Sequence, residues 1–114
     1  MTRIDSITEL FPSFTFRWTT PDGVAYINVI ESSPITIRIN IGKSGTSVAS
    51  WAYALAEMLN IVLQTHSVNQ VIDILTGITT HQSSFSRGVE CRSAAEAVGF
   101  SLTEYLRVKR KEEK

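Results

Sequence analysis

The sequence predicts an α+β fold, in which an N-terminal antiparallel β-sheet of about three strands is followed by two to three helices. Three observations predict it. Residues 13–41 alternate between apolar and polar side chains, with turn residues between the runs, and residues 47–110 carry apolar residues at helical spacing. No repeat or low-complexity segment interrupts the 114 residues. We therefore expect a single domain over residues 1–114.

The sheet is expected over residues 13–41. In SFTFRWTT the alternation puts Phe14, Phe16 and Trp18 on one side of a half-buried strand. The turn residues PDG follow, so VAYINVIE should return antiparallel as the second strand of a hairpin. ITIRINI alternates again as the third strand. Before the sheet, DSITELF predicts a short helix within residues 1–12, ended by Pro12.

Helices are expected over residues 47–110. The first, residues 47–65, is apolar nearly all the way round, and we expect one face to consist of Val48, Trp51, Leu55, Met58, Leu59 and Val62. So little polar surface predicts a helix that is buried in an oligomer interface. The second helix should run from Ser67 to a left-handed turn at Gly77, and the third should begin with a capping box of Ser93 and Glu96.

Composition narrows the classes of function. The chain has 11 Lys and Arg residues against 11 Asp and Glu residues, which argues against nucleic-acid and membrane-surface partners, so any anion site must be local. The single Cys91 excludes an internal disulfide, and Cys and His are too few for a zinc site, so no metal or cofactor is expected. No apolar run reaches the roughly 20 residues of a membrane span, and a cytoplasmic protein is expected.

The turn GKSGTS at residues 42–47 leads into the first long helix. A nucleotide-binding loop of the large ATPase class needs a glycine five residues before the Gly-Lys pair, and Ile37 stands there. Two interpretations stay open. The turn either simply joins strand and helix under a Ser or Thr cap, or it binds an anion through Lys43 and Ser44 at the helix N-terminus.

The stretch TTHQSSFSRGVECR at residues 79–92 predicts a polar loop, and loops of this length are uncommon unless they bind something or are disordered. It combines an isolated aromatic ring, two arginines around a glycine and a helix N-terminus, which are the groups that a base plus a phosphate require. The alternative is that the ring plugs the edge of the core and the arginines are solvated. The candidate ligand contacts are Phe85, Arg87, Arg92 and Ser93, with Arg17 and Arg38 on the polar side of the sheet as second candidates.

Groups for catalysis are few. His66 and His81 lie in polar turns with no carboxylate at a suggestive spacing, so a small hydrolase using His81 stays only as an alternative. Cys91 lies beside Arg92 near a helix N-terminus, which lowers a thiol pKa, yet a lone cysteine more often packs as a small hydrophobe. We expect a protein that is not an enzyme.

Three stretches carry a family resemblance over about residues 24–106: IRINIGKSGTSVASWAYALAEMLNIVLQ, VNQVIDILTGI and VECRSAAEAVGFSLTEYL. Together they resemble the TSCPD family, small α+β modules that are appended to some cobalamin-dependent ribonucleotide reductases and also stand alone. The naming motif is replaced here by Val89, Glu90, Cys91, Arg92 and Ser93, and Ser44 replaces the family's glycine-turn cysteine. The resemblance implies an accessory module of nucleotide metabolism, and these two departures from the family pattern argue against an inherited metal or thiol-relay role.

The layout of a sheet, helices and the loop RGVECRSAAEAV also looks like the phage anti-Thoeris sponge family. Those proteins are oligomeric and non-catalytic, and they sequester cyclic ADP-ribose-type immune signals, some of them cyclic oligonucleotides as well. This resemblance implies a homo-oligomer, a dimer or an assembly of dimers, that binds a cyclic nucleotide in the host cytoplasm as a counter-defence. A module linked to ribonucleotide reductase is the alternative.

Overall fold

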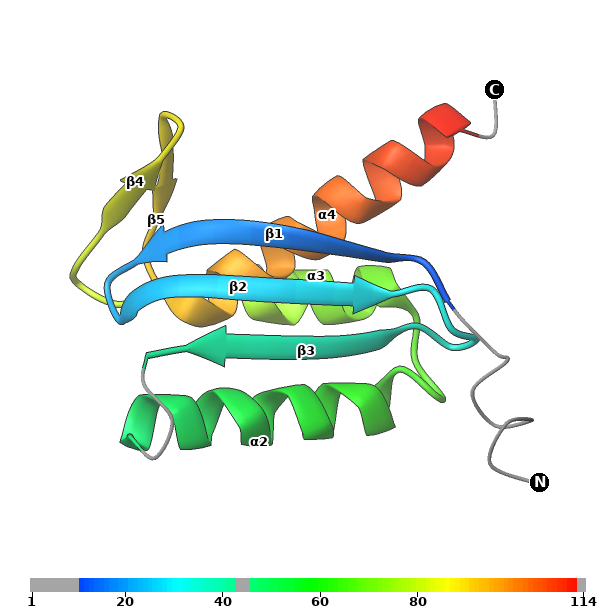
Figure 1. The fold of residues 1–114 in the computed structure, drawn as a ribbon. Coiled ribbons are helices and arrows are strands. Elements are labelled where there is room, and N and C mark those ends of the chain that lie inside the picture. The colour runs from blue at the N-terminus through cyan, green and yellow to red at the C-terminus, as the bar shows by residue number, and fades with distance from the viewer. Residues whose placement is uncertain (1–10, 43–45, 113–114) are drawn as a thin grey trace.

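A computed structural model describes residues 11–42 and 46–112 of the chain. The α+β architecture is confirmed: the three-stranded sheet comes first and three helices follow, with a small hairpin between the last two helices (Figure 1). The helix predicted within residues 1–12 falls mostly on residues 1–10, and Lys43 and Ser44 fall on residues 43–45, all of which lie outside the described residues.

The sheet occupies the residues that alternation predicted. Strands β1 (Ser13–Thr20), β2 (Gly23–Ile30) and β3 (Thr36–Ile41) pair antiparallel in the order β1-β2-β3. The register aligns Phe16 with Ile27 and Ile27 with Ile39, so one face of the sheet is apolar across all three strands. The opposite face carries Arg17, Arg38 and other polar side chains.

Helices α3 (Val68–Thr76) and α4 (Ala94–Glu112) lie behind the sheet in Figure 1 and cover its apolar face. Their buried side chains complete the core together with the inward strand residues; the helical members include Val71, Leu75, Val98 and Leu102. Ser67 caps α3 and forms a capping box with Gln70. Gly77 ends that helix as predicted, but its φ of −87° is right-handed, so the expected left-handed turn is wrong.

Helix α2 (Ser47–Val62) runs along the outer edge of β3 (Figure 1). The Asn60 side chain accepts a hydrogen bond from the Ile37 backbone N–H at 2.7 Å and donates one to the Ile37 carbonyl at 3.1 Å. A side-chain amide therefore takes the place of a fourth strand at this point of the edge. Capping edge groups in this way removes a template for unwanted strand pairing.

The inward face of α2 differs from the predicted one. Its buried residues are Ala52, Ala56 and Leu59, whereas Trp51 is 77% exposed and Met58 is 59% exposed. Small side chains face β3 because they let the helix backbone approach the strand closely. Of the face expected from the sequence, Leu59 is buried and Val48, Leu55 and Val62 are half-buried against the core, whereas Trp51 and Met58 lie on the outside of this chain.

Candidate functional site

The segment after α3 contains more structure than the predicted polar loop over residues 79–92. Strands β4 (Ser84–Ser86) and β5 (Val89–Cys91) form a hairpin joined by Arg87 and Gly88. Both turn residues have positive φ, 51° and 83°, as a two-residue type I′ turn requires. The hairpin places the Arg87 side chain at a defined position instead of on a featureless loop.

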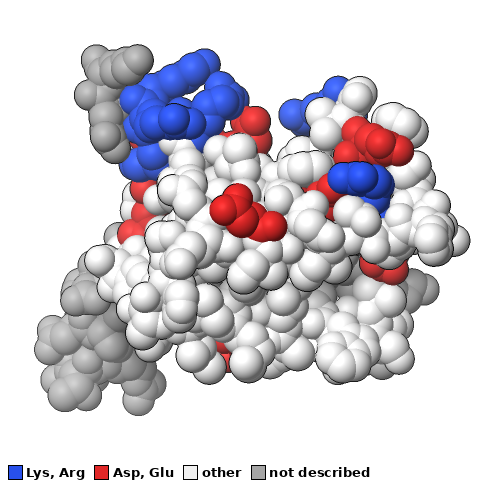
Figure 2. Space-filling model, turned by 180° about the vertical axis from the view of Figure 1, so that it is seen from behind, with Lys and Arg blue, Asp and Glu red and all other residues white. Residues whose placement is uncertain are grey.

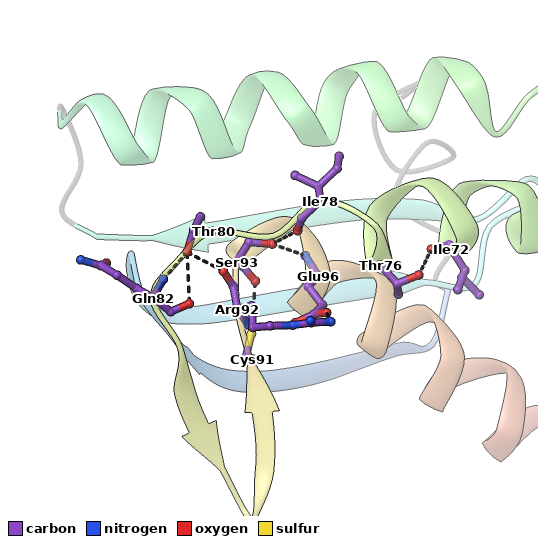
Figure 3. Close-up of polar contacts among 9 residues, drawn as sticks. All are labelled: Ile72, Thr76, Ile78, Thr80, Gln82, Cys91, Arg92, Ser93 and Glu96. Atoms are coloured by element: carbon purple, nitrogen blue, oxygen red, sulfur yellow. Dashed lines mark hydrogen bonds and ion pairs between the residues drawn. The ribbon is translucent and has the colours of Figure 1, made fainter.

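A compact polar network holds the base of this hairpin (Figure 3). The backbone N–H and the hydroxyl of Thr80 both donate to the Arg92 carbonyl, at 3.0 and 2.8 Å. The Ser93 hydroxyl donates to the Ile78 carbonyl and accepts from the Glu96 N–H at 2.9 Å. Ser93 therefore caps α4 as expected, and its hydroxyl is committed to the protein's own backbone.

Arg92 is also engaged within the chain. Its guanidinium lies 2.7 Å from Glu96 Oε2, and its backbone N–H donates to Glu96 Oε1 at 2.8 Å. The predicted capping box is thus only half formed, because the Glu96 carboxylate bonds to Arg92 instead of returning to the Ser93 N–H. Burial raises the pKa of Glu96, but the hydrogen bonds from Arg92 outweigh it and hold that pKa below the ordinary 4.5.

The candidate ligand site is a cavity of about 380 Å³ at the free edge of β1. It lies between that strand, the tip of the β4–β5 hairpin and α4, and its lining consists of Thr15, Phe16, Arg17, Trp18, Ser86, Arg87, Val89 and Glu104. The size falls within the 300–1,000 Å³ typical of small-molecule sites. Two segments about 70 residues apart in sequence therefore share one cavity.

The hairpin is fixed to β1 at this cavity. The Ser86 hydroxyl accepts a hydrogen bond from the Thr19 N–H at 2.5 Å, so it occupies one outward backbone group of the edge strand. Backbone groups of an antiparallel edge strand point outward at every second residue. The N–H and carbonyl of Thr15 and Arg17 therefore face the same side as the Thr19 N–H, toward the cavity.

Trp18 is the fixed aromatic residue of the site. Its indole N–H donates to the Ser101 hydroxyl at 2.8 Å, and its ring packs on Phe100 with centroids 5.4 Å apart. Two contacts thus hold the orientation of the ring before any ligand arrives. A ring held in this way loses little side-chain entropy when a ligand packs on it.

The cavity carries more positive than negative charge. Neither Arg17 nor Arg87 forms an ion pair or a side-chain hydrogen bond with any residue in the described ranges. The single carboxylate in the lining, Glu104, is already paired with Arg107, whose Nη2 lies 2.7 Å away. Two guanidinium groups at one cavity can bind a phosphate through paired hydrogen bonds.

Among the predicted site residues that the structure describes, only Arg17 and Arg87 line this cavity. Phe85 is 64% exposed and alternates with Ser84 and Ser86 along β4, so its ring projects from the opposite face of the hairpin. Arg38 lines a different cavity, of about 330 Å³, between β3 and α2. The sequence treated Trp18 as a core residue because it alternates with the apolar face of β1, and nothing local distinguishes it from Phe16.

The other chemical candidates show little preparation for catalysis. Burial raises the pKa of the Cys91 thiol, which is fully buried and donates to the Ser93 carbonyl at 3.1 Å. His66 is exposed and bonds to the neighbouring Thr65 hydroxyl, while His81 is exposed ahead of β4. Among the described residues, no group of three metal-ligating side chains comes together, and none of the described helices has the length and apolar character needed to cross a membrane.

Comparison of the chain with protein-family models, with curated proteins and with solved structures finds no match.

Proposed function

We propose that this chain is a non-catalytic binding protein for a small phosphate-bearing ligand of the nucleotide type. The observation that carries the proposal is the convergence of Arg17 and Arg87 on one cavity beside Trp18. Both guanidinium groups are without a protein partner in the described part of the chain, and burying such groups beside a phosphate yields short, charge-assisted hydrogen bonds. Trp18 also lines this cavity and offers apolar surface on which a base or ribose can pack.

The resemblance to the anti-Thoeris sponge family makes cyclic ADP-ribose-type signals and cyclic oligonucleotides the first ligands to test. A sponge needs a pocket with arginine and aromatic contacts and needs no general base, which agrees with the composition of this cavity. On this proposal the protein sequesters its ligand unchanged, as a phage counter-defence protein in the host cytoplasm. Sequestration does not require the Cys91 thiol or either histidine.

The test is a thermal-shift screen with cyclic ADP-ribose isomers, cyclic di- and trinucleotides, ATP and dNTPs. A ligand at about a hundred times its dissociation constant adds roughly 2.7 kcal/mol to stability, which corresponds to several degrees for a domain of this size. The proposal expects a shift with a cyclic nucleotide that Arg17→Met or Arg87→Asn abolishes. Asn is chosen at position 87 because it tolerates positive φ.

Arg38→Met is the matched control, since Arg38 lies on the same face of the sheet as Arg17 but in another cavity. It should leave the shift unchanged. Equal losses in the Arg38 and Arg17 variants would place the ligand elsewhere. A shift confined to dNTPs would instead support the module linked to ribonucleotide reductase, and chemical modification of the recovered ligand would contradict a non-catalytic role.

A further inference from the structure

Helix α2 exposes a row of side chains spaced like the contact positions of one helix in a coiled coil. Trp51, Ala54, Met58 and Ile61 follow each other at spacings of three, four and three residues, the a/d spacing of a heptad. All four lie in the exposed class, with Trp51 at 77% and Met58 and Ile61 each at 59%. We call these four residues the α2 seam.

The α2 seam lies apart from the helix face that packs on the sheet. Ala52, Ala56 and Leu59 face β3, and the seam residues occupy the side turned away from them. Glu57 is the single charged residue within α2. Figure 2 shows the lower part of the molecule, where α2 runs, as almost entirely uncharged, so little charge would lose its water if this side were covered.

We propose that the α2 seam is the interface of a homodimer in which α2 packs antiparallel against α2 of a second copy. The order of side-chain sizes along the seam favours a second copy of this chain as the partner that covers it. A two-fold axis near the middle of the seam places Trp51 opposite Ile61 of the second copy and Ala54 opposite its Met58. Large side chains then meet smaller ones in both halves, whereas a parallel pairing would set Trp51 against a second Trp51.

The area of the seam agrees with an interface of ordinary size. Trp51 offers about 150 Å², and Met58 and Ile61 offer on the order of 60 Å² each. A standard interface buries about 800 Å² per partner, of which about 480 Å² is apolar. Three side chains thus supply about half of that apolar area, before Ala54 and the flanking Leu55 and Val62 are counted.

The interface is independent of the proposed ligand cavity, because α2 lines the β3 edge and the cavity lies at the β1 edge of the sheet. Dimer formation can therefore be tested without any ligand. Light scattering coupled to size exclusion at micromolar concentration should give twice the chain mass of 12.7 kDa for the unaltered protein. A monomer mass for that protein overturns the proposal.

Trp51→Glu should convert the dimer to a monomer, with Tyr53→Glu as the matched control. Tyr53 is a 68% exposed aromatic residue on the same helix, but it lines the cavities on the polar side of the sheet. The control should keep the dimer mass, and dissociation of both variants alike would overturn the assignment to the seam. A far-UV circular dichroism spectrum like that of the unaltered protein, together with a cooperative urea transition, verifies that each variant remains folded; the midpoint of a monomeric variant falls because it has lost the stabilisation from dimer formation.

Oxidative cross-linking tests the antiparallel register without disrupting the fold. The double variant Trp51→Cys with Ile61→Cys should form a disulfide-linked dimer, because the two positions face each other across the axis. Trp51→Cys alone should not, since the two copies of this position lie about 15 Å apart along the helices and a disulfide needs less than about 7 Å. Efficient cross-linking of that single variant would overturn the register. The native Cys91 is fully buried, so it should not take part in cross-linking between copies.

Discussion

Gly99 lies where α4 crosses α3, and a methyl group at this position would meet a closely packed surface. An added Cβ would fall 2.7 Å from Cγ2 of Thr76 and 3.3 Å from Cβ of Leu75. Thr76 cannot rotate away freely, because its hydroxyl donates to the Ile72 carbonyl at 2.8 Å. Gly99→Ala gains about 1 kcal/mol of helix propensity. Overpacking costs about 1–3 kcal/mol, so we expect a net loss of up to about 2 kcal/mol.

A double-mutant cycle with Thr76→Ala separates the steric effect from helix propensity. Thr76→Ala removes the Cγ2 atom, so Gly99→Ala in that background should be neutral or stabilising, and the coupling between the two sites should reach about 1–2 kcal/mol. The four proteins are compared by urea unfolding followed by far-UV circular dichroism. Equal effects of Gly99→Ala in both backgrounds, or stabilisation by Gly99→Ala alone, would refute the reasoning from close packing.

Three further substitutions test contacts that hold the site and its scaffold. Asn60→Ala removes both hydrogen bonds to the edge backbone of Ile37 and should lower the free energy of unfolding by about 1–3 kcal/mol; an unchanged urea midpoint would contradict this role. Ser101→Ala leaves the Trp18 indole N–H without its acceptor and should cost about 1–3 kcal/mol, measured in the same way, and it should weaken ligand binding if Trp18 is a wall of the site. Because the pKa of Glu96 is lowered in the folded protein, its ionised form stabilises the fold fully above about pH 4.5, and this stability is lost as the pH falls through the folded-state pKa. Glu96→Gln should therefore make the free energy of unfolding decline less steeply with acid. An acid profile identical to that of the unaltered protein would count against this role of Glu96.

The strands were predictable because their pattern repeats every two residues over a long run. The alternation around Phe14–Trp18 and Ile35–Ile41 fixes which side chains face the core, because a slip of one residue would turn the apolar side chains to solvent. The turn at residues 21–23 joins the first two strands. Strands β4 and β5 were missed because each is three residues long and the side facing the body consists of serine, valine and cysteine. Their pairing depends on positive φ at Arg87, which a local pattern does not reveal.

The inner face of α2 was predicted only in part, through Leu59 and its half-buried neighbours, for a different reason. Apolar residues surround this helix, so periodicity cannot choose between the large side chains and the alanines. Contact with a strand edge favours Ala52 and Ala56, since a helix that must bring Asn60 within 2.7 Å of the Ile37 backbone cannot hold a tryptophan between them. The sequence could therefore predict that α2 needs a cover, but only the structure separates the face that β3 covers from the α2 seam.

The candidate site also could be predicted only in part from the sequence, because residues far apart in the chain form it. Arg87 was predicted in one site with Phe85, Arg92 and Ser93, and Arg17 only as a second candidate. The cavity that Arg17 and Arg87 share depends on where the hairpin lies against β1, which the Ser86 hydroxyl fixes at Thr19. The two outer strands of the sheet are thus completed in different ways. A helix closes β3 through Asn60 and leaves an apolar seam outside, while a hairpin closes β1 only in part and leaves arginines beside free backbone groups. An apolar seam is suited to another protein surface and an arginine-lined edge to an anion, so the proposed dimer interface and the proposed ligand site lie at opposite edges of the sheet and need not compete.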